Sequence, residues 1–123
     1  MSINSTHEKV LDDVLSRWKA DVDAHKPDGV ALLFAEDAIF QGLHPYGVGR
    51  ADIAEYYDSQ PLGMVANYEI LETRSPAKGV VLGYMRAIFT FTERQPVEVN
   101  LSLLLRQVGG DWLINHYQVS KLD

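Results

Sequence analysis

The second half of the chain reads MVANYEILETRSPAKGVVLGYMRAIFTFTERQPVEVNLSLLLRQVGGDWLINHYQVSK (residues 64–121). Residues that favour strands (Thr, Val, Ile, Tyr and Phe) are enriched in it, and turn signals interrupt it at Ser75-Pro76, Gln95-Pro96 and Gly109-Gly110. We therefore predict four antiparallel strands, at about residues 64–74, 79–93, 97–108 and 112–121. Because such strands exceed the usual length of about 5 or 6 residues, the sheet is expected to be strongly twisted or bent.

The first half of the chain predicts helices. One amphipathic helix is expected from about residue 5, because apolar residues recur there at steps of three and four. Pro27 suits the first turn of a short second helix, roughly residues 28–34, and helical spacing returns at residues 50–58. Between them, a brief strand at about 38–41 leads into a glycine-rich loop. Three N-terminal helices followed by a strand meander predict an α+β fold in which helices cover one face of a curled, mostly antiparallel sheet.

Length and charge narrow the class of protein. The chain has 123 residues, which is the size of a single domain (1–123). Its net charge is −6 and its eleven Lys and Arg residues are scattered, so nucleic acid is not an expected partner. No apolar stretch approaches the roughly 20 residues of a membrane span, and the polar start lacks the pattern of a signal peptide. We therefore expect a cytoplasmic protein that has no contact with a membrane.

Several kinds of site are not predicted. The chain has no cysteine, and its four histidines are far apart in the sequence, so no metal site is expected. Phosphate-binding loops, nucleotide fingerprints and serine elbows are also missing from the sequence. We therefore predict no cofactor.

Four segments resemble the nuclear transport factor 2-like superfamily, which has a cystatin-like cone fold. They are residues 17–18, 32–40, 49–53 and 111–120, which read RW, LLFAEDAIF, GRADI and DWLINHYQVS. Together they are similar to its SnoaL-like branch, which includes the SgcJ/EcaC-type proteins and the kinase association domain. The resemblance implies a cone with an internal pocket, lined by the concave face of the sheet, and dimers that pair sheet to sheet.

The strands agree with this expectation of a homodimer. Segments such as residues 84–91 and 101–105 carry apolar side chains on both alternating faces. A sheet that is buried on one side only shows a cleaner alternation. We therefore expect a partner chain to cover the second face.

The resemblance also places this chain apart from ketosteroid isomerase. That enzyme has a tyrosine in the first helix and an aspartate shortly after the first strand, and the matching positions here are Trp18 and Gly42. Glycine cannot act as a base, and an indole is a poorer donor to an oxyanion than a phenol. Many relatives also have a histidine at the position of Gln118. Isomerisation by the same mechanism is therefore disfavoured.

Strand alternation gives the main candidate site. It places Ile114, His116, Gln118 and Ser120 on one face of the last strand, and Asn115, Tyr117 and Val119 on the other. We predict that the first set faces the pocket, together with three residues of neighbouring strands: Tyr84, Arg86 and Asn100. His116 is the candidate general base, although it also fits a hydrogen-bonded spacer or a dimer contact. Arg86 fits either a ligand carboxylate or a salt bridge.

Other candidate ligand-binding residues are aromatic or lie in the glycine-rich loop. His44 and Tyr46 belong to that loop, where the pocket mouth is expected, although both also fit ordinary turn residues. Trp18, Phe40 and Tyr57 are expected to line an apolar cavity, or else to be plain core.

The sequence therefore predicts a protein that binds a small, largely apolar organic ligand. Such a protein could be a cofactor-independent isomerase, cyclase or hydratase. The alternative is a non-catalytic dimerisation or accessory module that resembles the kinase association domain.

Overall fold

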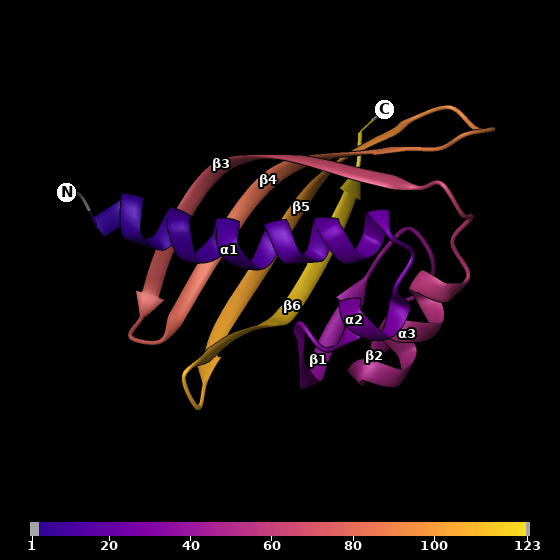
Figure 1. The fold of residues 1–123 in the computed structure, drawn as a ribbon. Helices are drawn as coiled ribbons and strands as arrows, with labels where there is room; N and C mark the ends of the chain where they lie inside the picture. Colours follow the sequence, from indigo (N-terminus) through magenta and orange to yellow (C-terminus); the bar gives the residue numbers. More distant parts are fainter. Residues whose placement is uncertain (1–2, 123) are drawn as a thin grey trace.

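The computed structural model describes residues 3–122, with side chains from residue 6 onward. The chain forms, in order, α1 (Ile3–Asp23), α2 (Pro27–Ala31), β1 (Phe34–Gln41), β2 (Gly47–Val48), α3 (Gly49–Asp58), β3 (Val65–Ala77), β4 (Val80–Thr90), β5 (Val97–Val108) and β6 (Asp111–Lys121) (Figure 1). The fold is α+β, as the sequence predicts. The four long strands agree with their predicted positions to within a few residues, whereas β1 begins earlier than expected and β2 was not predicted.

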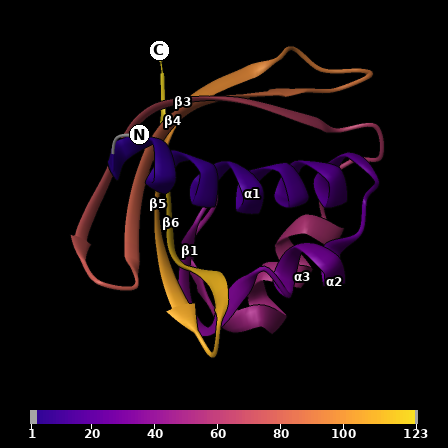
Figure 2. The same ribbon diagram turned by 60° about the vertical axis from the view of Figure 1, so that its left-hand side comes forward.

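All six strands belong to one curved sheet, in the order β2-β1-β6-β5-β4-β3. Neighbouring strands are antiparallel except β1 and β6, which are parallel. Figure 2 shows the long strands bending around α1, which lies across the concave face of the sheet. The strong twist expected of such long strands therefore lets the sheet curve around a helix.

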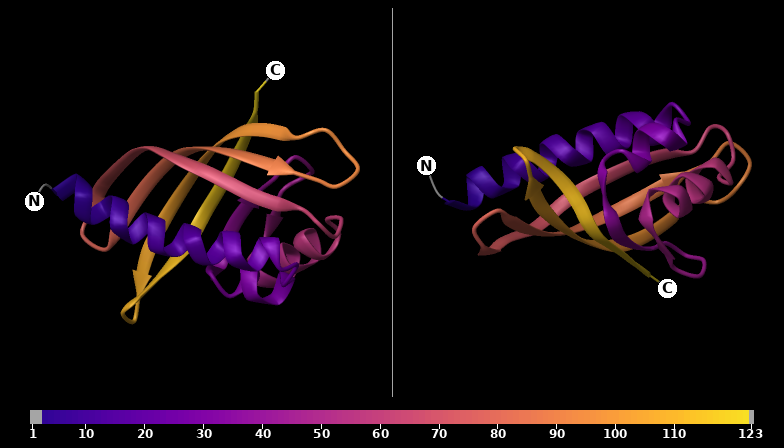
Figure 3. Two further views of the ribbon diagram at one scale, coloured as in Figure 1. Left: turned by 45° about the horizontal axis from the view of Figure 1, so that its top comes forward. Right: turned by 90° about the horizontal axis from the view of Figure 1, so that it is seen from below.

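Helix α1 packs through the apolar stripe that its sequence predicts. The buried residues of the stripe are Leu11, Val14, Leu15, Trp18 and Val22. At one point the helix touches the sheet backbone closely, because a Cβ built on Gly83 of β4 would overlap Leu11 Cδ2. Figure 3 shows that α1, α2 and α3 all lie on the concave side of the sheet. No described helix is long and apolar enough to cross a membrane.

A polar clamp holds the end of α1 against β3. Lys19 Nζ lies 2.8 Å from Asp23 Oδ2 and donates a hydrogen bond of 2.7 Å to the backbone oxygen of Ala66. Asp23 Oδ1 accepts a hydrogen bond of 2.9 Å from the Ala66 backbone N–H. Both backbone groups of Ala66 that face α1 are therefore satisfied, which fixes the start of β3 beside the helix.

Candidate functional site

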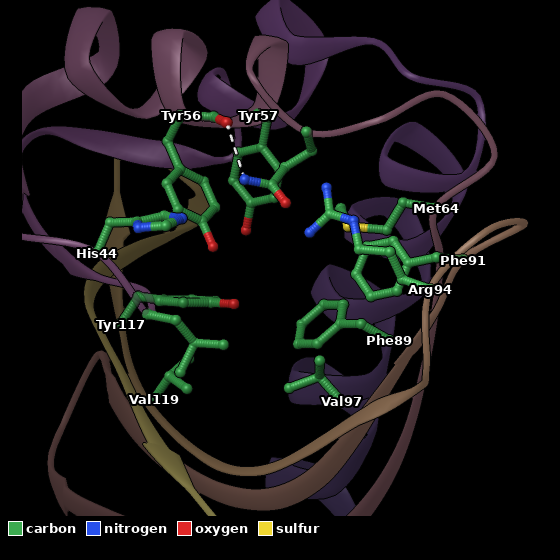
Figure 4. A pocket seen from close by; sticks show the side chains of 12 residues that line it. His44, Tyr56, Tyr57, Met64, Phe89, Phe91, Arg94, Val97, Tyr117 and Val119 are labelled. Carbon is green, nitrogen blue, oxygen red and sulfur yellow. Dashed lines mark hydrogen bonds between the residues drawn. The ribbon is translucent and has the colours of Figure 1, made fainter.

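A cavity of about 180 Å³ lies between the concave face of the sheet and helix α3 (Figure 4). Its wall combines residues of α3 and the flanking loops with residues of β4, β5, β6 and the β4–β5 hairpin. Most of these side chains are apolar or aromatic, and only a few are polar, which is typical of pockets for small organic molecules. The lining residues are Leu43, His44, Tyr56, Tyr57, Gln60, Met64, Phe89, Phe91, Arg94, Val97, Tyr117 and Val119.

Three tyrosine hydroxyls point into this space from two sides. Figure 4 shows Tyr56 and Tyr57 descending from α3, while Tyr117 reaches in from β6. Behind them, Trp18 Nε1 donates a hydrogen bond of 3.0 Å to the hydroxyl of Tyr57. The indole of α1 therefore supports the cavity wall from the core.

Burial keeps these phenols protonated. It raises the pKa of Tyr57 and of Tyr117 above the ordinary value of 10.0, and it raises the pKa of Tyr56 as well. After burial, the nearby Tyr57 phenol also raises the pKa of Tyr117.

The hairpin between β4 and β5 supplies the one guanidinium of the cavity wall. Arg94 Cζ lies 4.9 Å from the centre of the Phe91 ring, which is a cation–π distance. Arg94 is exposed and makes no ion pair within residues 6–122. Figure 4 shows its guanidinium turned toward the space into which the tyrosine hydroxyls point.

Of the three aromatic residues predicted to bind a ligand, Tyr57 lines the cavity, whereas Trp18 and Phe40 do not. Trp18 is fully buried behind the wall. Phe40 is also buried, and its ring stacks on Tyr117 with centroids 4.5 Å apart and an interplanar angle of 16°. Both are core residues, the alternative that the sequence left open, and both hold tyrosines of the cavity in place.

Of the two predicted loop residues, His44 lines the cavity and Tyr46 does not. The ring of His44 lies 6.1 Å from that of Tyr56. Tyr46 is 66% exposed and borders a shallow depression beside the cavity. Gly42 lies directly under Tyr56, since a Cβ at this position would come within 2.8 Å of the phenol carbon Cζ. The Tyr56 ring therefore leaves no room for a side chain at residue 42.

The predicted strand face was wrong. Tyr84, Arg86, Asn100, His116 and Gln118 do lie together, but on the outer face of the sheet, away from the cavity. In the register, Tyr84 and Gln118 pair with the same residue of β5, Ser102, and Arg86 pairs with Asn100. None of the five lines the cavity.

A β-bulge in β6 explains this correction. Leu105 pairs with Ile114, but the preceding residue of β5, Leu104, pairs with His116, so Asn115 is an extra residue. Beyond the bulge the alternation is reversed, which turns Tyr117 and Val119 inward and His116 outward. His116 is therefore not placed to act as a base in the cavity. Arg86 forms an ion pair with Glu98, at 3.4 Å, as one of the two alternatives for it predicts.

Sequence reasoning missed three important residues of the cavity. Tyr117 and Val119 were assigned to the other face, because strict alternation does not anticipate the bulge, and Arg94 was not considered as a candidate. The sequence did contain a signal for Arg94. It is a cation three residues after Phe91, in the turn between two long predicted strands, and such a turn lies at one end of the cone. Among residues 6–122, no group of His, Asp and Glu side chains is arranged to hold a metal ion.

Comparisons with known proteins identify the fold. No family model and no curated protein matches the chain. A ketosteroid isomerase-like protein from Erwinia carotovora atroseptica has a TM-score of 0.81 at 22% identity, over 94% of this chain and 95% of that one. A calcium/calmodulin dependent protein kinase II association domain from Xanthomonas campestris also has a TM-score of 0.81, at 17% identity, over 91% and 85% of the two chains.

An NTF-2 like protein of unknown function from Shewanella oneidensis has a TM-score of 0.80 at 12% identity, over 93% of this chain and 98% of that one. A protein from Nostoc punctiforme with a cystatin-like fold has a TM-score of 0.82 at 14% identity, over 100% and 80% of the two chains. The cystatin-like, nuclear transport factor 2-like fold expected from the sequence is therefore confirmed.

Proposed function

From the nuclear transport factor 2-like fold of this chain, we propose that it binds a small, largely apolar organic molecule in the cavity beneath α3. The observation that carries the proposal is the cavity itself, about 180 Å³ with an apolar floor and a few convergent hydroxyls. An engineered apolar cavity of roughly 150 Å³ is large enough to bind benzene. The cavity therefore suits a ligand built on a single ring or a chain of similar size.

Ligand binding is a better account of this site than the proton-transfer chemistry that the sequence allowed. The lining residues include no Asp or Glu, and His44 is their one imidazole. The phenols are held in their protonated form, so they are hydrogen-bond donors rather than bases. An isomerase, cyclase or hydratase of this design would depend on His44 as its base.

Filling the cavity tests the proposal. We expect wild-type protein to bind phenol, a neutral one-ring probe, in an isothermal titration, and Val119→Phe to weaken that binding at least about tenfold, or about 1.4 kcal/mol. Val119 lines the cavity, so a larger side chain there occupies the volume of the probe. Val108→Phe is the matched control, because Val108 lies at the exposed end of β5.

Phenol binding that is equal in wild type, Val119→Phe and Val108→Phe would show that the probe lies elsewhere and would contradict the proposal. Thermal melting of each variant establishes that it is folded at the temperature of the titration.

The outer face of the sheet supports a second proposal, a homodimer. Leu82, Tyr84 and Ile88 are large apolar side chains there that are 37–40% exposed. Arg86 and Glu98 form an ion pair among them, so the face offers a charge of each sign, which a two-fold partner would meet with the opposite charge. The same face would be the binding surface of the alternative, a non-catalytic dimerisation or accessory module. The burial of Trp18 and Phe40 favours this alternative, because these two side chains fill part of the interior of the cone.

A charge on this face is expected to separate the subunits. We expect Ile88→Glu to shift the mass measured by light scattering from that of two chains to that of one, because a carboxylate cannot be buried there without a partner. Leu62→Glu, on an exposed loop residue outside the sheet, is the control and is expected to remain a dimer. A wild-type mass of one chain at all concentrations would exclude the dimer.

A further inference from the structure

Every polar side chain of the cavity can donate a hydrogen bond, and none is a carboxylate. These side chains comprise the guanidinium of Arg94, three phenols, the imidazole of His44 and the amide of Gln60. Gln60 Nε2 is directed to the backbone oxygen of Tyr56, at 3.5 Å. A cavity wall with this composition complements a ligand that carries hydrogen-bond acceptors and a negative charge.

Two of the phenols have hydroxyl protons that are free for a ligand. The Tyr57 oxygen accepts a hydrogen bond of 3.0 Å from Trp18, whose indole N–H can only donate. The Tyr56 hydroxyl lies near the backbone of Leu43, which lowers the pKa of this phenol less than burial raises it. Neither hydroxyl proton has an acceptor among residues 6–122, so both are available to a ligand in the cavity.

Arg94 supplies the matching charge. A guanidinium remains protonated at any physiological pH and binds carboxylates with two parallel N–H···O bonds. Its stacking on Phe91 orients the side chain toward the cavity without neutralising it. Because Arg94 has no carboxylate partner within the described part of the chain, a ligand carboxylate would not have to displace one.

We propose that the ligand is an apolar monocarboxylate, either an aryl or a short alkyl acid. Its carboxylate lies between the Arg94 guanidinium and the hydroxyls of Tyr56 and Tyr57, and its apolar body lies on the floor formed by Phe89, Val97 and Val119 (Figure 4). This inference rests on the proposed function, because it names the chemical class of the molecule in the same cavity. It does not depend on whether the outer face forms a dimer.

Three one-ring probes of similar size test the charge preference. Benzoate, benzyl alcohol and benzylamine are titrated into wild-type protein at pH 7 by calorimetry. Since hydrogen bonds to charged groups are stronger than those between neutral groups, we expect benzoate to bind at least about tenfold more tightly than benzyl alcohol. Benzylamine, a cation, is expected to bind most weakly of the three.

Substitution of the guanidinium assigns the preference to a residue. Arg94→Met is expected to reduce benzoate affinity about tenfold while leaving benzyl alcohol unchanged, because it keeps the apolar stem and removes the charge. Arg74→Met is the control, since Arg74 pairs with Glu72 at 3.1 Å and lines no part of this cavity. Tyr57→Phe is expected to weaken benzoate binding several-fold, through loss of one donor.

The outcomes separate this inference from the function on which it rests. Equal affinity for benzoate and benzyl alcohol would overturn the carboxylate assignment and leave a cavity that binds neutral molecules. A benzoate preference that persists in Arg94→Met would also overturn it, because the charge would then be read elsewhere. No binding of any probe, phenol included, would overturn both proposals.

Discussion

Replacing Phe40 by alanine is expected to lower the free energy of unfolding by about 3–5 kcal/mol, because the site cannot collapse around the lost ring. Phe40 is 2% exposed and stacks on Tyr117. Its ring centroid also lies 4.7 Å from that of Tyr56 and 5.6 Å from that of Tyr57. Urea denaturation followed by fluorescence measures the change.

The same substitution is expected to weaken ligand binding, because Phe40 supports the three tyrosines that line the cavity. Phe40→Leu is the matched variant, since it keeps much of the volume and is expected to cost less than half as much. A loss of less than about 1 kcal/mol in Phe40→Ala would contradict the central role of this ring.

Replacing Gly83 by valine is expected to lower the free energy of unfolding by about 1–3 kcal/mol, the usual range for overpacking a core. A Cβ at Gly83 would overlap Leu11 Cδ2 and lie 2.8 Å from Leu11 Cδ1. Leu11 is fully buried, so its side chain has no solvent space into which to move. The result is a displacement of α1 from the sheet or a partial loss of its packing, measured again by urea denaturation.

A double-mutant cycle with Leu11→Ala identifies the cause. Alone, this substitution is expected to cost about 2–5 kcal/mol through the cavity that it leaves. In the double variant, Leu11→Ala makes room for the valine. The free energy of unfolding lost by the double variant is therefore expected to be about 1–3 kcal/mol smaller than the sum of the losses in the two single variants. Strictly additive losses would show that the contact between α1 and β4 is not what requires the glycine.

The fold could be predicted from the sequence because its signals are local. The stripe that includes Leu15 and Trp18 fixes the buried face of α1, and turn residues such as Gly109-Gly110 separate the strands. The early start of β1 was missed because residues 34–37 pair irregularly, with a register shift between Phe34 and Ile39. No local composition marks such a shift.

The site was predicted less well because one residue decides which side chains face it. Asn115 is the extra residue of the bulge in β6, and its amide donates a hydrogen bond of 3.0 Å to Asp37 of β1. The partner that accommodates the bulge therefore lies 78 positions away in the sequence, out of reach of any periodicity argument. Tyr57, by contrast, does line the cavity, because it lies on the regular helix α3, where no bulge changes the direction of its side chain.

The parallel pairing of β1 with β6 has a consequence for the order in which the protein can fold as it is synthesised. Phe34 of β1 aligns with Ile114 of β6, so β1 has only the two-residue β2 beside it until the ribosome has released residues 111–121. Closing so long a loop is slow compared with forming the adjacent β3–β4, β4–β5 and β5–β6 hairpins. We therefore expect the meander to form first, and β1, with the adjacent residues Leu43 and His44 that line the cavity, to join it last.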